Sequence, residues 1–154
     1  MNQINTSRTP HNFSLFTFSF SLIIMFTLVV SADFSRDGDI VVDSVTKLEW
    51  QDDAIVDSME WKETISHCED DVSLGGYDNW RLPNINELKT IIDRSRYNPA
   101  TVSIFEHTSS YYYWSSTTYE GNHEFAWSVY SVDGNISNSN KDCEYSVRCV
   151  RDGD

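Results

Sequence analysis

The sequence predicts an α+β domain in which two helices pack on antiparallel strands. Two segments, 57–71 and 84–94, place apolar residues at helical spacing. The segments 40–51 and 109–151 instead alternate apolar and polar residues, which is typical of half-buried strands. Short turns separate the strands within each segment, so we expect a hairpin in the first and a meander in the second.

The first 32 residues differ from the rest of the chain. Arg8 is their only charged residue, and residues 13–30 are almost wholly apolar or small. Ala32 supplies a small residue where signal peptidase would cut, while an apolar run of 18 residues is also just long enough to span a bilayer. We therefore expect 1–32 to be a signal peptide or an uncleaved N-terminal anchor, with membrane contact only through this segment. Residues 33–154 would form one domain, either secreted or held in the periplasm or at the cell surface.

The expected domain is strongly acidic. It contains all 24 acidic residues of the chain and ten of the 11 basic ones, which leaves a formal charge of −14. Binding to nucleic acid draws most of its affinity from neutralising phosphates. The charge therefore argues against a nucleic-acid partner and against adsorption to anionic lipid.

Three cysteines, Cys68, Cys143 and Cys149, fall in the exported part, where oxidation is the default. Three cysteines cannot all pair within one chain, so we expect one disulfide and one free thiol. A bridge between Cys68 and Cys149 closes the longest loop and joins the first helix to the last strand, and we predict this pairing. A bridge between Cys143 and Cys149 is the alternative.

The first strands are expected at 40–42 and 47–51, with a turn at 43–46 between them. The acidic stretch 33–39 before them is typical of a turn. Its aspartates suggest a calcium loop, but they lack the ligand spacing of an EF-hand. We predict no metal site there.

The two helices have recognisable start and stop signals. The first is expected to begin at Asp57 or the next residue and to end near 69–71, where negative charge is unfavourable at a helix C-terminus. The second is expected to begin after Asn84, with Glu87 completing a capping box, and to end near Asp93 or the following residue.

Trp80 and Leu82, just before the second helix, alternate like a short buried strand. Arg81 lies between these two apolar residues. Because buried charges are normally paired, we expect it to bind a carboxylate or backbone carbonyls.

The second half of the chain is expected to form a meander. Strands are predicted at 109–119 and 125–132, with a hairpin signal at 133–134. The segment 135–142 is polar and rich in asparagine, and we interpret it as a loop. A last strand is predicted at 144–151.

No catalytic constellation is recognisable. His67, His107 and His123 lack the spacing of metal ligands, no glycine loop could cradle a phosphate, and no serine lies in a nucleophile elbow. We predict a protein that is not an enzyme and needs no cofactor.

Tyrosines beside amide-rich segments indicate a different chemistry, because aromatic rings stack on sugar rings and amides bond their hydroxyls. Within 109–119, Tyr112 and Trp114 share one face and Trp114 is the core candidate, which leaves the other tyrosines for the surface. The candidate ligand-binding residues are Tyr111, Tyr113, Tyr119, Asn135, Asn138 and Asn140. The alternative is that the tyrosines pack on neighbouring strands and the asparagines only solvate a loop.

Three motifs in order give the sequence a family resemblance: GGYDNWRLPN at 75–84, YWSST at 113–117 and VRCVR at 147–151. From about residue 39 to residue 151 the chain resembles the Lcl C-terminal domain family, named for the C-terminal domain of a bacterial collagen-like adhesin. The resemblance implies an α+β plan similar to C-type-lectin-like modules. It also implies extracellular attachment, with sulfated glycosaminoglycans as the ligands of the founding adhesin.

The charge of −14 opposes the approach of a sulfated polysaccharide. We therefore expect an exported binding module for a neutral glycan or a surface protein. The alternative function is a structural or assembly domain of the cell envelope that has no small ligand.

Overall fold

The computed structural model describes residues 33–54 and 58–153. The predicted signal peptide or anchor at 1–32 and the predicted helix cap Asp57 lie outside the described residues. Within them, no helix combines the length and the apolar character needed to cross a membrane.

A four-stranded antiparallel sheet in the order β1-β2-β3-β9 brings an early segment beside the last one. Its strands are β1 (Phe34–Asp37), β2 (Ile40–Asp43), β3 (Leu48–Gln51) and β9 (Val150–Asp152). The predicted hairpin of β2 and β3 is confirmed. The prediction of a turn over 33–39 is wrong for β1, because these residues pair with β2 along their whole length and Phe34 packs edge-on against Phe105, with ring centroids 6.2 Å apart.

A second antiparallel sheet has the order β5-β6-β7. It consists of β5 (Tyr112–Thr118), β6 (Phe125–Tyr130) and β7 (Asn135–Asn140). The interpretation of 135–142 as a loop is wrong, because β7 pairs with β6 through all six of its residues. Backbone pairing needs no apolar side chain, so a polar segment at the edge of a sheet can still be a strand.

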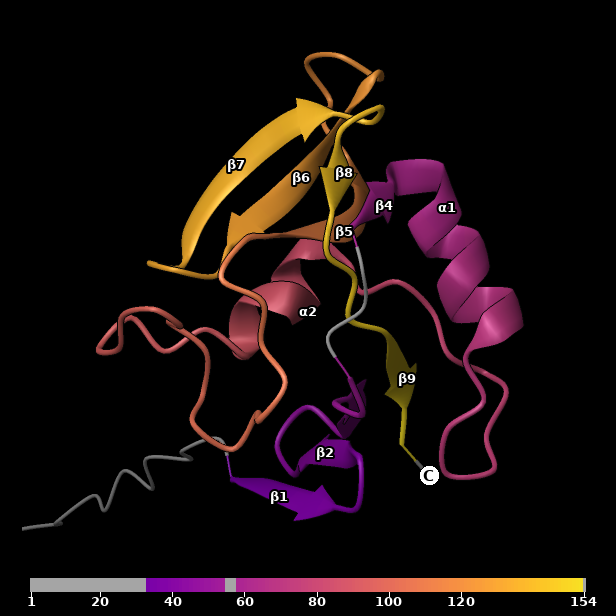
Figure 1. Cartoon of the computed structure of the whole chain (residues 1–154), viewed down its shortest axis with the longest axis vertical. Coiled ribbons are helices and arrows are strands. Elements are labelled where there is room, and N and C mark those ends of the chain that lie inside the picture. The colour runs from indigo at the N-terminus through magenta and orange to yellow at the C-terminus, as the bar shows by residue number, and fades with distance from the viewer. Residues whose placement is uncertain (1–32, 55–57, 154) are drawn as a thin grey trace, which may run out of the picture.

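The last predicted strand, 144–151, is divided in two. β8 (Glu144–Tyr145) pairs with the short strand β4 (Met59–Glu60), while β9 belongs to the four-stranded sheet. Between them, Ser146 forms a parallel bridge with Tyr113 of β5. This segment therefore connects the sheets β1-β2-β3-β9, β4-β8 and β5-β6-β7 (Figure 1).

The helices are shorter than predicted. α1 (Trp61–Ser66) is capped by a box of Glu60 and Glu63, and it continues as the π-helical segment η1 (His67–Asp71). The predicted end near 69–71 is confirmed, whereas the start lies several residues after Asp57.

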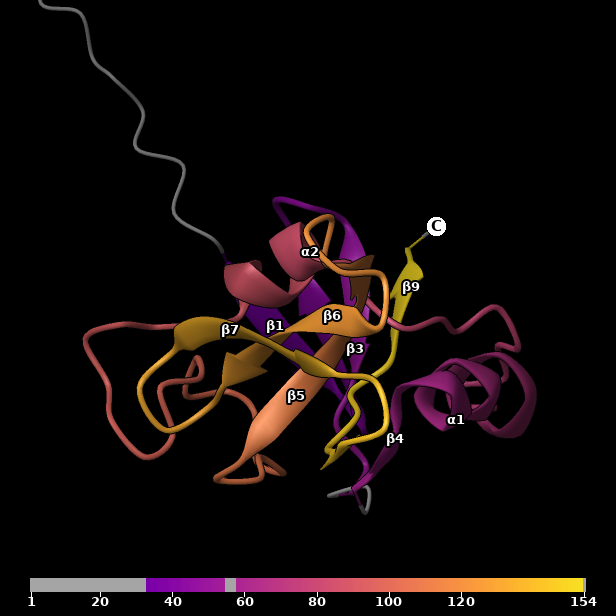
Figure 2. The same cartoon turned by 90° about the horizontal axis from the view of Figure 1, so that it is seen from above.

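The second helix, α2 (Ile85–Thr90), begins as predicted. The Asn84 side-chain oxygen accepts from the Glu87 amide at 3.0 Å, and the Glu87 carboxylate accepts from the Asn84 amide at 2.8 Å. The helix ends before the predicted position near Asp93, because Ile92 forms a bridge with Thr101 instead. Figures 1 and 2 show α2 against the sheet β5-β6-β7, and α2 contacts both β5 and β6.

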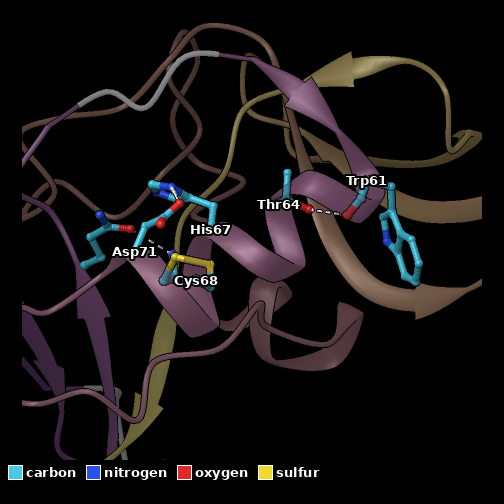
Figure 3. Close-up of a disulfide and its surroundings, with 7 residues drawn as sticks. Trp61, Thr64, His67, Cys68 and Asp71 are labelled. Atoms are coloured by element: carbon cyan, nitrogen blue, oxygen red, sulfur yellow. Dashed lines mark hydrogen bonds and ion pairs between the residues drawn. A yellow bond between two sulfur atoms is a disulfide. The ribbon is translucent and has the colours of Figure 1, made fainter.

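The core contains the tryptophans that the sequence placed there. Trp80 and Trp114 expose 2% and 0% of their surface, and both pack in the same apolar cluster. The predicted disulfide between Cys68 and Cys149 is confirmed, with the two Cα atoms 5.6 Å apart. Figure 3 shows Cys68 on the helical segment that also carries His67 and Asp71.

The α+β class is confirmed: the sheets are mostly antiparallel and the helices are short. The finer likeness to C-type-lectin-like modules stays a prediction.

Candidate ligand-binding face

The strands β5, β6 and β7 contain no charged residue. Their polar side chains are hydroxyls and amides, and their apolar ones are mainly aromatic. Since the chain carries 24 acidic and 11 basic residues, this sheet is an uncharged region of a highly charged molecule. It is suited to a ligand that is recognised by stacking and neutral hydrogen bonds.

Four tyrosines gather on one face of this sheet, and we call them the tyrosine cluster: Tyr111, Tyr112, Tyr130 and Tyr145. Tyr112 and Tyr130 are cross-strand partners on β5 and β6, so their side chains point to the same face. Tyr145 arrives from β8, and Tyr111 directly precedes β5. The face is thus assembled from three separate segments.

Three rings of the cluster are stacked. The Tyr112 centroid lies 4.6 Å from that of Tyr130 and 4.8 Å from that of Tyr145, with interplanar angles of 27° and 20°. The buried Trp114 ring lies 4.5 Å from Tyr145 and anchors the stack to the core. These ring faces largely cover one another, so the stack is mainly a support.

Tyr111 is the exposed member of the cluster. Its ring stands nearly perpendicular to those of Tyr112 and Tyr145, at 5.6 Å from each, and 46% of the residue is exposed. Edge-to-face contacts of this kind stabilise an aromatic pair beyond the area that it buries. The neighbouring rings therefore hold Tyr111 in place at the surface.

Hydroxyl groups line the same face. The Tyr145 hydroxyl and Ser139 Oγ on β7 are 2.8 Å apart and share a hydrogen bond. Burial raises the pKa of Tyr145 above its ordinary value, and the bond with Ser139 opposes this shift only in part. Tyr145 is therefore neutral at physiological pH and adds no charge to the face.

The predicted residue Tyr113 is not at the surface. It is only 6% exposed, packs in the core, and its hydroxyl accepts a hydrogen bond from the Ser109 amide at 2.7 Å. The expectation that Tyr113 shares an accessible face with Tyr111 is wrong. Within β5, Tyr113 points to the face opposite that of Tyr112, toward the core beside Val129. Tyr111 precedes β5, so its side chain does not follow the alternation of the strand.

Two further predicted residues lie on the same face as Tyr113. Asn138 is the cross-strand partner of Trp127, and the half-buried Tyr119 ring packs at 88° against the Trp127 ring, with centroids 5.2 Å apart. The cross-strand pairs alternate in direction, so Trp127 points away from the tyrosine cluster. Asn140 shares this face through its pairing with Phe125.

Asn135 is exposed and lies opposite Tyr130, next to the tyrosine cluster. Its side-chain amide donates to Asp133 at 2.6 Å. Of the predicted residues, the structure thus places Tyr111 in the tyrosine cluster and Asn135 beside it, as the cross-strand partner of Tyr130. The sequence did not identify Tyr112, Tyr130 and Tyr145 as members of the site, because cross-strand register and the position of β8 are not visible in a single sequence.

The predicted pairing of Arg81 is confirmed. Its guanidinium donates to the Glu87 carboxylate at 2.8 and 2.9 Å and to Asp152 at 3.0 Å. The hydrogen bond to Glu87 raises the pKa of Arg81, although partial burial opposes this effect. Arg81 therefore links α2 to β9. A ligand could bind the Arg81 guanidinium only by displacing the Glu87 and Asp152 carboxylates from it.

A hollow of about 590 Å³ beside α1 is lined mainly by polar and charged residues: Met59, Glu60, Lys62, Glu63, Ser66, His67 and Asp71. In the part of the chain that the structure describes, no three residues of the metal-ligating types are close enough to hold an ion. The His67 Nδ1 atom lies 3.5 Å from the Asp71 carboxylate, and His107 Nδ1 contacts the Asp52 carbonyl oxygen at 2.8 Å. Both contacts bind the histidines to the scaffold.

Comparison with known proteins identifies the family. A search of the curated proteins finds no match. The profile of the Lcl C-terminal domain matches residues 39–151, which covers nearly all of the described structure and includes the three motifs of the sequence. The chain therefore belongs to the Lcl C-terminal domain family.

Proposed function

We propose that this domain is an exported, non-catalytic binding module that recognises a neutral or weakly charged glycan through the tyrosine cluster. The observation that carries the proposal is the exposed Tyr111 ring, which Tyr112 and Tyr145 hold at one face of an uncharged sheet. A sugar ring stacks on an aromatic face through its C–H groups, and hydroxyls and amides satisfy its polar groups.

The parts of the face have different roles in this proposal. Tyr111 supplies the stacking surface, while Tyr112, Tyr130 and Tyr145 hold it. Asn135 and the hydroxyl groups along β7 supply donors and acceptors. A preformed platform lowers the entropy that binding would otherwise cost.

The charge of the molecule favours a neutral ligand. The exported part carries a formal charge of −14, and no basic residue lies on the strands of this sheet. A sulfated glycosaminoglycan, the ligand class that the family resemblance implies, would meet long-range repulsion here. We also propose that the domain functions outside the cytoplasm, since a disulfide is typical of oxidising compartments.

A second candidate function is a structural or assembly role in the cell envelope. The observation in its favour is that three of the four tyrosines stack on one another and so already have partners. In that case Tyr111 would be a surface residue of the scaffold, with no small ligand.

A glycan array followed by titration tests the proposal. We expect binding to a neutral oligosaccharide that changes little between low and physiological salt, because stacking and neutral hydrogen bonds are barely screened. Tyr111→Ala should weaken this binding by about tenfold, the loss of roughly 1.4 kcal/mol of stacking. Tyr97→Ala is the matched control, since Tyr97 is 76% exposed and lies outside the cluster.

Two outcomes would contradict the proposal. Tight, salt-sensitive binding to heparin that Tyr111→Ala leaves unchanged would restore the sulfated ligand class. The absence of any glycan ligand for a correctly folded protein would favour the structural role.

A further inference from the structure

The two edges of the sheet β5-β6-β7 differ in whether another segment of the described chain pairs with their backbone. The outer edge of β5 is occupied by Ser146: the Trp114 amide donates to the Ser146 carbonyl at 3.1 Å, and the Ser146 amide donates to the Tyr112 carbonyl at 2.9 Å. Across residues 33–54 and 58–153, no strand pairs with the outer edge of β7. In Figure 1, β7 forms the outer margin of this sheet.

The register shows which backbone groups of β7 face outward. The Lys141 amide donates to the Glu124 carbonyl at 2.8 Å, one step beyond the pair of Phe125 and Asn140. Hydrogen-bonded and non-hydrogen-bonded pairs alternate along an antiparallel ladder. The backbone groups of Ile136 and Asn138 therefore point away from β6. In the described part of the chain no main-chain group bonds them, and Asn138 O receives only a long 3.5 Å contact from Ser137 Oγ.

This edge lacks the features that normally prevent strands from pairing between molecules. Such features are charged side chains, proline, a bulge or a very short strand. β7 has six residues and carries no charge and no proline, and its register with β6 is continuous. Ile136 is in addition 38% exposed, which adds an apolar side chain to an open edge.

We propose that β7 pairs with β7 of a second copy of this chain and forms a symmetric antiparallel dimer. A second copy fits this edge because its own β7 is equally uncharged. Two domains of residues 33–154, each of formal charge −14, repel each other elsewhere, but pairing through β7 brings no like charges into direct contact. A two-fold axis through an antiparallel pair uses the same strand from both copies.

One register satisfies the free groups. Ile136 of each copy exchanges both backbone hydrogen bonds with Asn138 of the other, and Ser137 lies on the two-fold axis. The sheet then continues across the interface, and the tyrosine clusters of the two copies lie on the same side of it. If the cluster binds a glycan, the dimer presents two sites to one polymer and gains avidity. The dimer itself does not depend on that function.

Sedimentation velocity and amide exchange on the protein as purified from its producing cell test the dimer. We expect a concentration-dependent dimer that becomes more populated at high salt, where repulsion is screened. Exchange of the Ile136 and Asn138 amides should slow as protein concentration rises, while the exposed loop amide of Tyr97 should not change.

Asn138→Pro removes one outward amide and leaves the ladder with β6 intact, so the dimer should be lost without loss of fold. Asn138→Ala is the matched control, because it keeps the amide and should keep the dimer. A monomer at all concentrations and both salts would overturn the proposal, as would a dimer that persists in a folded Asn138→Pro variant. Since neither result depends on a glycan, failure here is distinct from failure of the proposed function.

Discussion

Asp52 and Arg148 form a buried ion pair across 96 residues of sequence, with Arg148 Nη1 2.7 Å from Asp52 Oδ1. Asp52 is fully buried and Arg148 is 4% exposed. Asp52 also binds Arg36 and accepts from the backbone amides of Glu106 and His107. One carboxylate thus joins β1, the end of β3, the loop before β5 and the segment between β8 and β9.

Asp52 should make the protein sensitive to acid. Burial alone would raise the pKa of this carboxyl, but the bonds from Arg36 and Arg148 outweigh burial and hold the pKa below its ordinary value of 3.8. As the pH falls, the unfolded chain therefore takes up this proton before the folded one. Stability should be fully present near neutral pH and should decline below about pH 4, as thermal unfolding at a series of pH values will show.

Asp52→Asn should lower the free energy of unfolding by about 3 to 5 kcal/mol at neutral pH, because it leaves the buried Arg148 guanidinium without the negative charge that it pairs with. It should also flatten the acid limb of the pH profile. Asp53→Asn is the matched control, since Asp53 is exposed and should change neither quantity appreciably. An Asp52→Asn variant as stable as the native protein would contradict this account.

The disulfide should contribute strongly to stability. Cys68 and Cys149 are 81 residues apart, and closing a loop of that length restricts the unfolded chain by about 4 to 5 kcal/mol in the chain-entropy description. Replacing both cysteines by alanine should lower the free energy of unfolding by several kcal/mol in a denaturant titration. Cys143→Ala should have a smaller effect, because Cys143 is a free, half-buried thiol. If reductant left the native protein's unfolding midpoint unchanged, the bridge would not stabilise the fold.

Local signals in the sequence identified the parts of the fold that depend on neighbouring residues. The capping box of Asn84 and Glu87, the turn at 133–134 and the two buried tryptophans are examples. Each depends on residue types at a fixed spacing, and such spacing is visible in one chain.

Features set by distant partners could not be predicted in the same way. The polar side chains of β7 predict a loop, although its backbone is paired with β6. The alternation of Tyr113 with the core residue Trp114 predicts that Tyr113 lies at the surface. The sequence pattern does not reveal the second core cluster, on the other side of the sheet, in which Tyr113 packs. A sheet with both faces partly covered has no single apolar face for a sequence to reveal.

Trp80 and Trp114 should be essential to the fold. Both are almost completely buried, and the Trp114 indole also donates to the Met59 carbonyl at 3.2 Å. Replacing either by alanine should lower the free energy of unfolding by about 3 to 5 kcal/mol and reduce the yield of soluble protein. The measurement is chemical denaturation of the purified variants. A variant that kept its stability but lost glycan binding would place the ligand site around that tryptophan.

Tyr113→Phe and Tyr111→Phe should differ in stability although they delete the same atom from residues only two positions apart. The Tyr113 hydroxyl accepts a hydrogen bond from the Ser109 amide at 2.7 Å in a part-buried site. Removing this hydroxyl therefore leaves the Ser109 amide without a partner. That loss should cost about 1 to 3 kcal/mol. Tyr111 is 46% exposed, and in the described residues its hydroxyl bonds no protein group, so Tyr111→Phe should change stability by less than about 0.5 kcal/mol. Denaturant titration of the two variants side by side measures the difference. Equal stabilities would mean that the hydrogen bond of the Tyr113 hydroxyl does not stabilise the fold. The burial of Tyr113 would then be the remaining evidence that it does not bind a ligand.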